Sequence, residues 1–295
     1  MNNGFIIVNK ERGFTSFDVC AKLRGILKTK KIGHTGTLDP DATGVLLVCV
    51  GNATKAVDIL PDEDKQYRAV IRFGITTDTE DISGNVLSTC ERKVNEDDIR
   101  AVITSFVGNI KQIPPMYSAI KVNGKKLYEL AREGKVVERK ARDITIHNIV
   151  IEDISYPYAT ILVDCSKGTY IRTLCKDIGE KLDVGACMES LVRTRAGGFD
   201  IKKALTLNEI EEKVKAGQAD SIIIPTEALF DKYDISCVRD GAVSMAENGN
   251  RLKATDFKDV PSSGRIRVYI GDRFIGIYEF DRERNDYKPY KMFLN

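Results

Sequence analysis

Hydrophobic residues fall into continuous and alternating runs that predict strands. Residues 5–8 and 45–50 are continuous apolar runs, which are typical of strands buried on both faces. Residues 66–73 alternate instead, with Tyr67 on the apolar side, and this pattern predicts a half-buried strand. Two longer runs, at about 144–154 and 159–165, also predict strands.

Between these runs, apolar residues at helical spacing predict helices. They cover about 16–28, with Ser16 as the expected N-cap, a segment that opens at Asn95, a short helix at 127–132, and 170–182. A further helix opens at Thr206 with a capping box. Strict βαβ repetition and a glycine-rich nucleotide loop are absent from the sequence. We therefore expect an α+β fold with a mixed, largely antiparallel central sheet and flanking helices.

The pattern changes after residue 225, where short strands alternate with turns rich in Gly, Asn and Ser. Residues 265–270 and 274–278 flank Gly271 and Asp272, which predicts a β-hairpin. We expect one large domain over residues 1–228 and a small β-rich domain over residues 229–295.

Composition limits the classes of function. The 295 residues carry a formal net charge of only +2, so nucleic-acid binding would depend on local basic patches. Seven scattered cysteines without a CxxC pair, and only two histidines, argue against a disulfide framework or a zinc site. No apolar run is long enough to span a membrane, and no secretory signal pattern is present. These features predict a cytoplasmic globular protein with reduced thiols.

One acidic residue occupies a position suited to chemistry. Asp39 lies on a bend of Gly, Thr and Pro directly before the buried strand at 45–50, so its carboxylate has a fixed position. A nucleophile or general base needs such a position. The competing interpretation is a simple turn, because Asp-Pro pairs are common in turns.

Two segments combine Lys or Arg with nearby tyrosines, residues 121–126 and 166–172, and two more, residues 139–142 and 191–195, add further cations. Cations neutralise phosphates and aromatic rings stack on unpaired bases, so this combination suits RNA. Taken singly, each segment is a weak signal, because a run of charges is usually a solvated surface.

The motifs together carry a family resemblance. They are Asn9-Lys10 with Gly13 and Thr15-Ser16, GHTGTLDP at 33–40, ATG at 42–44, KQYR at 65–68, PPMYSA at 114–119, KKLYE at 125–129, SKGTYIRT at 166–173, and Leu191 with Arg193-Thr194. In this order and spacing the chain resembles the bacterial TruB-type tRNA pseudouridine-55 synthases. Glu11 departs from the family pattern, which usually has Pro there.

The resemblance implies a pseudouridine synthase fold with a C-terminal PUA-like RNA-binding domain. It implies that the protein isomerises uridine 55 in the T-arm loop of tRNA, flipped out of its loop, without a cofactor or metal. Asp39 maps onto the family's nucleophile, Tyr67 onto its active-site tyrosine and Arg172 onto its arginine. Burial would favour the protonated acid, and Arg172 would offset this. The carboxylate could attack C1′ or C6, or a glycal could form.

The resemblance also implies RNA contacts and partners. The expected contacts are His34, Lys31, Tyr170, Leu191, Lys121, Lys125, Lys126 and Arg193. An insertion at about residues 110–142 would clasp the T-arm, and the C-terminal domain would lie along the acceptor stem. We expect a monomer whose partner is tRNA, with no guide RNA and no membrane.

Two rival functions remain at this point. The protein could grip and remodel tRNA without modifying it, or it could be an RNA-guided synthase of the ribonucleoprotein type. The set of Asp39, Tyr67 and Arg172 argues against the first as a sole role. The compact chain argues against the second.

Overall fold

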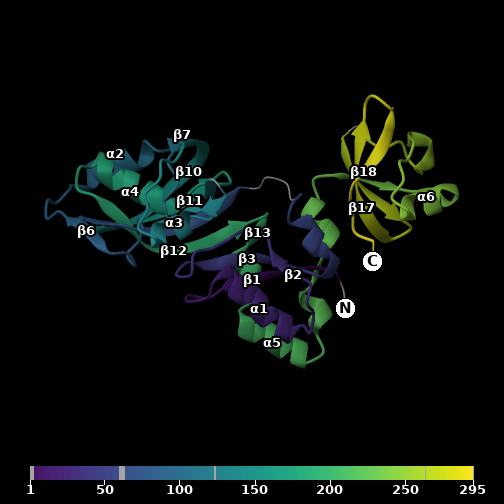
Figure 1. Ribbon diagram of the computed structural model, residues 1–295, viewed down its shortest axis with the longest axis horizontal. Coiled ribbons are helices and arrows are strands. Elements are labelled where there is room, and N and C mark those ends of the chain that lie inside the picture. The colour runs from purple at the N-terminus through teal and green to yellow at the C-terminus, as the bar shows by residue number, and fades with distance from the viewer. Residues whose placement is uncertain (1–2, 60–63, 123, 263, 295) are drawn as a thin grey trace.

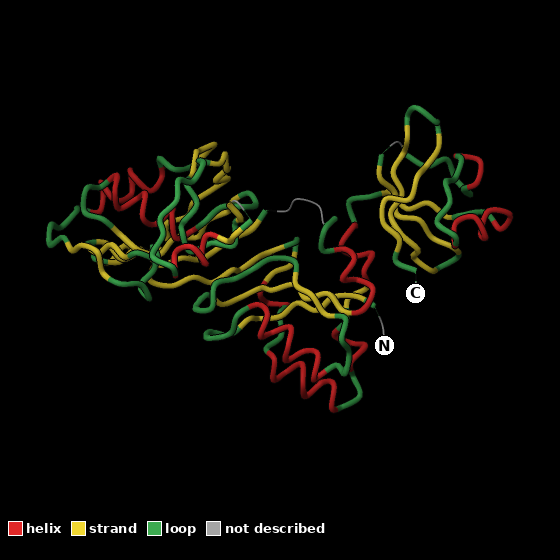
Figure 2. Tube along the Cα trace, viewed as in Figure 1, coloured by secondary structure: helices red, strands yellow, loops and turns green. Residues whose placement is uncertain are grey.

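The structure is a computed structural model that describes residues 3–59, 64–122, 124–262 and 264–294. Among these residues, ten strands form one sheet (Figures 1 and 2). Its main path runs β14 (Ile224–Pro225), β1 (Gly4–Lys10), β3 (Thr43–Val50), β12 (Ala186–Ala196), β4 (Lys65–Phe73), β11 (Tyr158–Cys165), β10 (Arg142–Ser155) and β7 (Gly108–Gln112). Off this path, β2 (Ile32–His34) pairs with β3, and β13 (Phe199–Asp200) pairs with β12.

Helices cover this sheet in two groups, and two small hairpins extend from it. The helices are α1 (Ser16–Ile26), α2 (Glu96–Thr104), α3 (Leu127–Arg132), α4 (Ile171–Lys181) and α5 (Leu207–Lys215). Figure 1 shows α1 and α5 side by side near β1, and α2 and α4 at the other end of the sheet. The hairpins are β5 (Ile75–Thr77) with β6 (Val86–Thr89), and β8 (Lys121–Val122) with β9 (Lys125–Lys126).

The first half of the sheet follows from the two continuous apolar runs. β1 and β3 pair antiparallel along their whole length, from Gly4 opposite Val50 to Lys10 opposite Gly44. Ile6, Val8, Leu46 and Val48 pack on one side with apolar residues of α1 and α5. The other side faces a second cluster that includes Phe5 and Phe230. Burial on both faces explains why these runs lack alternation.

The two halves of the sheet meet where β3 and β12 run parallel. Only Val192 with Thr43 and Arg193 with Gly44 pair there, in the residues that the structure describes. Gly44 has a φ of +103°, and a Cβ at this position would lie 2.3 Å from the Arg193 carbonyl oxygen. Glycine is therefore required for this close approach. The other ladders are antiparallel, so the predicted mixed, largely antiparallel sheet is confirmed.

Most predicted helices are confirmed, and one predicted cap is wrong. Thr206 caps α5 through a capping box with Glu209, as expected. The N-cap of α1, however, is Thr15 and not Ser16, because Thr15 pairs reciprocally with Asp18 three residues on. Ser16 instead bonds the backbone of Leu38, which ties α1 to the loop that carries Asp39.

The C-terminal residues form a separate four-stranded sheet. Its order is β15 (Asp234–Cys237), β16 (Arg265–Ile270), β17 (Arg273–Asp281) and β18 (Asp286–Met292), with α6 (Val243–Glu247) beside it. The hairpin predicted around Gly271 is β16–β17. Figure 1 shows this β-domain standing to one side of the large sheet. The boundary at 228/229 and the PUA-like assignment stay predictions.

None of the helices in the described ranges is both long enough and apolar enough to cross a membrane.

Candidate active site

Asp39 and Arg172 form a two-point ion pair. Asp39 lies in the loop between β2 and β3, and Arg172 is the second residue of α4. Arg172 Nε lies 3.1 Å from Asp39 Oδ2, and Nη2 lies 3.2 Å from Oδ1. This side-by-side geometry is the strongest form of an arginine–carboxylate pair. The structure thus brings together two predicted site residues that are far apart in the sequence.

Three further acceptors hold the guanidinium of Arg172. Nη1 donates to the Thr79 carbonyl at 3.0 Å, and Nη2 donates to the Tyr117 carbonyl at 2.8 Å. Asp81 Oδ2 lies 3.7 Å from Nη1. The side chain is only 6% exposed, so these contacts replace its lost hydration. Arg172 therefore has a fixed orientation.

Asp39 experiences opposing influences on its pKa. Burial raises the pKa most, Arg172 and Lys10 lower it, and Asp81 raises it, so that on balance the pKa lies above its usual range. The expected offset by Arg172 is present but incomplete. The Asp39 side chain is still 39% exposed, so water solvates the carboxylate and limits the effect of burial.

Lys10 anchors the loop that carries Asp39 from its buried side. Its side chain is fully buried, and Nζ donates to the carbonyls of Phe14 at 2.7 Å, Pro40 at 3.0 Å and Glu11 at 3.1 Å. Burial lowers the pKa of Lys10 to about 8, although Asp39 and Asp41 oppose the shift. Lys10 was not among the predicted site residues, although it belongs to the Asn9-Lys10 motif of the family resemblance.

Arg193 also holds the loop that carries Asp39. It was expected at the RNA-binding surface, but it lies in the interior. It is 2% exposed on β12, and Nε donates to the Val45 carbonyl at 2.7 Å. Nη1 and Nη2 donate to the Thr37 and Gly36 carbonyls, each at 3.4 Å. This burial argues against the predicted direct contact with RNA. A charge-rich segment indicated a surface, but the strand register turns Arg193 inward, where it faces Tyr67 on β4.

Tyr67 lies at the inner side of the site. It is 8% exposed and packs in the core cluster that also contains Leu38 and Leu191. Burial raises the pKa of its hydroxyl most, the charge of Arg193 lowers it, and the charge of Asp39 raises it. The phenol is therefore protonated at neutral pH.

His34 lies at the outer side, at the end of β2. Its ring meets the ring of Phe17 edge to face, with centroids 5.2 Å apart. Burial and Arg193 lower the pKa of His34, so the imidazole is neutral at pH 7. Its buried Nδ1 has no hydrogen-bond partner in the described part of the molecule.

The other predicted contacts divide between core and surface. Leu191 is 7% exposed, and Tyr170 is half-buried, with both backbone polar groups bonded to the Gln112 side chain. Lys31, Lys121 and Lys125 are exposed. Lys126 is half-buried, 3.3 Å from the Tyr128 hydroxyl.

Asp81 is a site residue that was not predicted, because it lies in none of the motifs. It contacts Arg172. The next residue, Ile82, fixes the segment to β12 through a bond from its amide to the Met188 carbonyl.

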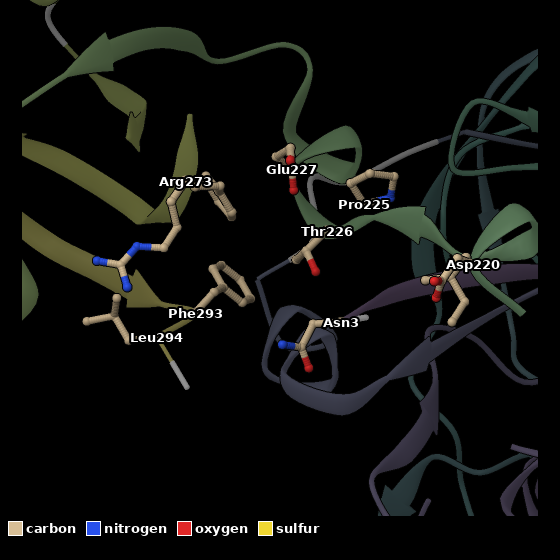
Figure 3. A pocket seen from close by; sticks show the side chains of 10 residues that line it. Asn3, Asp220, Pro225, Thr226, Glu227, Arg273, Phe293 and Leu294 are labelled. Carbon is tan, nitrogen blue, oxygen red and sulfur yellow. The ribbon is translucent and has the colours of Figure 1, made fainter. Parts of the chain in front are cut away.

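A separate pocket lies at the junction with the C-terminal domain. Figure 3 shows Asn3, Asp220 and Thr226 facing Arg273 and Phe293 across it. None of the predicted catalytic residues lines this pocket. The chemistry-bearing cluster is instead the open rim around Asp39.

Two family models match most of the chain. Residues 24–171 match the family model of the TruB family pseudouridylate synthase N-terminal domain. Residues 172–231 match that of the tRNA pseudouridylate synthase B C-terminal domain.

Relatives and solved structures cover nearly the whole chain. The tRNA pseudouridine synthase B of Lachnoclostridium phytofermentans is 52% identical, covering 99% of this chain and 100% of that protein. That of Clostridium tetani is 44% identical over 95% of this chain and 96% of its own. A chain in the crystal structure of a Cbf5–Nop10–Gar1 complex is 26% identical, with a TM-score of 0.76 over 99% of this chain and 85% of that one. The chain belongs to the TruB family of pseudouridylate synthases.

Proposed function

We propose that this protein isomerises uridine 55 in the T-arm loop of tRNA to pseudouridine, with Asp39 as the nucleophile and without a guide RNA. The two-point pair between Arg172 and Asp39, at 3.1 and 3.2 Å, carries the proposal. It holds a partly exposed carboxylate in one orientation at the rim of a packed core. The names of the relatives supply the class of RNA.

The reaction is an isomerisation, so it consumes no second substrate. The N1–C1′ bond breaks, the uracil turns, C5 bonds to C1′, the proton leaves C5 and N1 gains one. Asp39 must be ionised to attack the nucleoside, and Arg172 favours that state. Tyr67 packs in one core cluster with Leu38, the residue before Asp39, so its ring suits packing against the uracil. Its hydroxyl relays the C5 proton by accepting it while giving up its own.

The target base must leave its loop to reach Asp39. Extrusion costs a few kcal/mol and is least costly for a base that is already unpaired. The exposed cations Lys31, Lys121 and Lys125 are suited to hold the RNA backbone while the base is turned out. Leu191 and Tyr170 supply apolar surface near the acid.

We also propose that the protein works alone, as a monomer in the cytoplasm. The identity of 52% to a tRNA pseudouridine synthase B over 99% of the chain supports this more strongly than the 26% identity to a Cbf5 complex.

The test is purified protein with an unmodified tRNA transcript and nothing else. Mass spectrometry of nuclease fragments should place pseudouridine at position 55, and a transcript with cytidine at 55 should stay unmodified. The proposal fails if position 55 stays uridine, or if modification appears only after a small-RNA fraction is added.

A further inference from the structure

Phe17 is an aromatic side chain that the proposed reaction leaves unused. It is 70% exposed, and Tyr158, at 37%, is the only other exposed Phe or Tyr among the described residues. Exposing a phenyl ring forfeits about 2 kcal/mol of burial energy. The other exposed residues of this turn, Thr15 and Asp18, are polar, so Phe17 does not belong to an apolar patch.

Its position links it to the active site. Phe17 lies in the first turn of α1, where its ring meets the His34 ring at an interplanar angle of 86°. The preceding residue, Ser16, accepts a hydrogen bond from the Leu38 amide at 3.0 Å. Leu38 is the residue before Asp39. The Phe17 ring is therefore held at the outer edge of the loop that carries the acid.

A run of positive charge extends from this ring. Arg24 lies two turns beyond Phe17 on the same face of α1. Both residues contact β2: Arg24 donates to the Ile32 carbonyl at 3.2 Å at one end, and Phe17 contacts His34 at the other end. Residues 19–38 contain no Asp or Glu. We name four exposed cations of this segment the basic ridge, namely Arg24, Lys28, Lys30 and Lys31, and leave out the exposed Lys22, which lies over the Phe14 ring.

We propose that Phe17 and the basic ridge bind the RNA strand that adjoins the target uridine. Phe17 stacks on an unpaired base beside the extruded one, and the ridge contacts the phosphates that follow. An aromatic platform next to a track of cations is the arrangement that single-stranded nucleic acid requires. The proposal rests on the proposed function, because it takes its RNA from there.

Binding is measured apart from turnover. An Asp39→Asn background and a T-arm stem-loop RNA are used, with 2-aminopurine replacing each loop base beside the target uridine in turn. Phe17→Ala and Phe17→Leu should each raise Kd about 5- to 100-fold, and Phe17→Tyr should restore the parent value. At one loop position the fluorescence quenching on binding should disappear in Phe17→Leu. Leu87→Ala, which removes an apolar side chain that is 68% exposed on β6, is the matched control and should leave Kd unchanged.

The basic ridge is tested by salt dependence. Replacing Lys28 and Lys30 together with Gln should lower the slope of log Kd against log salt by about 1 to 1.5. The matched pair Lys202 and Lys203, also exposed, should leave the slope unchanged when replaced in the same way.

The inference is overturned if Phe17→Leu binds within two-fold of the parent protein, or if the ridge variant keeps the parent slope. These readouts do not require turnover. If the wild-type protein does not modify uridine 55, the proposed function is refuted. If Phe17→Leu nevertheless weakens RNA binding, this inference stands.

Discussion

The Asp39 loop and the insertion at residues 110–142 are held in opposite ways. Buried cations and a buried hydroxyl fix the loop: Lys10, Arg172, Arg193 and Ser16 all bond to it. Among its described residues, the insertion has a small core of three buried apolar residues, Met116, Leu127 and Leu130, with five partly buried ones packed against them. Weakly packed segments open at low free-energy cost. The reacting geometry is thus built into the rigid part, and the RNA contacts proposed for Lys121 and Lys125 lie in a part that can rearrange.

Arg172 of α4 bonds to both regions. Tyr117, at the base of the insertion, offers its carbonyl to the same Nη2 of Arg172 that contacts Asp39. Rearrangement of the insertion would therefore change the hydrogen bonding of Arg172. Substitutions in the rigid part should therefore change turnover, and substitutions in the adaptable part should change tRNA binding.

Asp39→Asn should have the largest effect, because it removes the nucleophile from the rigid part. Turnover should fall at least about 10³-fold. tRNA affinity should change little, since the amide has nearly the same shape. Single-turnover assays and filter binding on the same preparation give both numbers. Substantial residual turnover would exclude Asp39 as the nucleophile.

Arg172→Met should lower turnover at pH 7 by about 10²-fold. Arg172 lowers the pKa of Asp39, so its loss raises that pKa further and moves the acidic limb of the pH–rate profile to higher pH. Arg172→Lys should shift the limb less. A thermal melt controls for stability, because the variant leaves buried acceptors unpaired. An unchanged pH profile would refute the pairing.

Tyr67→Phe should separate the ring from its hydroxyl. If the hydroxyl relays the C5 proton, turnover should fall about 10²-fold while binding stays near normal. Release of tritium from 5-tritiated uridine in tRNA measures the step directly. Wild-type turnover would exclude proton transfer by Tyr67.

Lys10→Met tests the anchor of the rigid part through pH. The pKa of Lys10 is lowered to about 8, whereas the unfolded chain binds this proton up to about 10.5. Between these values the unfolded state holds more protons, so wild type gains stability relative to the variant as pH rises, by up to about 3 kcal/mol. Urea unfolding of both proteins from pH 7.5 to 10.5 measures the difference. A constant difference across this range would contradict the shift.

Replacing Lys121 and Lys125 with Gln should have the smallest effect, about 3- to 10-fold in tRNA Kd, because it removes only exposed phosphate contacts from the adaptable part. Turnover at saturating tRNA should stay near wild type. Hydrogen exchange over residues 124–141 should slow when tRNA binds. Equal exchange with and without tRNA would show that the insertion does not order on binding.

Strands were predictable where burial alone decides the pattern. The apolar run of β3 and the alternation of β4 follow from which faces are covered. Tertiary contacts decided the rest. Thr15 and Ser16 are both good caps, and two contacts separate them: Thr15 forms a capping box with Asp18, and Ser16 bonds the backbone of Leu38. Lys10 defies the rule that lysine is almost never fully buried.

The site shows the same division. Asp39 and Arg172 could be predicted through a resemblance, since both lie in dense motifs. Asp81 could not, because its contact with Arg172 joins segments about 90 residues apart without any local pattern. Arg193 looked like a surface charge, and only the register of β12 against β4 places it inside.

The narrow joint at Gly44 has a consequence for how the enzyme tolerates change. The acid belongs to one half of the sheet and the arginine to a helix packed on the other half, so the reactive pair spans a seam closed by two residue pairs. Each half has a hydrophobic cluster of its own, and Leu38 and Ala42, on either side of Asp39, pack into the cluster of the second half. A substitution at Gly44 would thus move Asp39 relative to Arg172 while both halves remain folded. Turnover would then fall more than the melting temperature does.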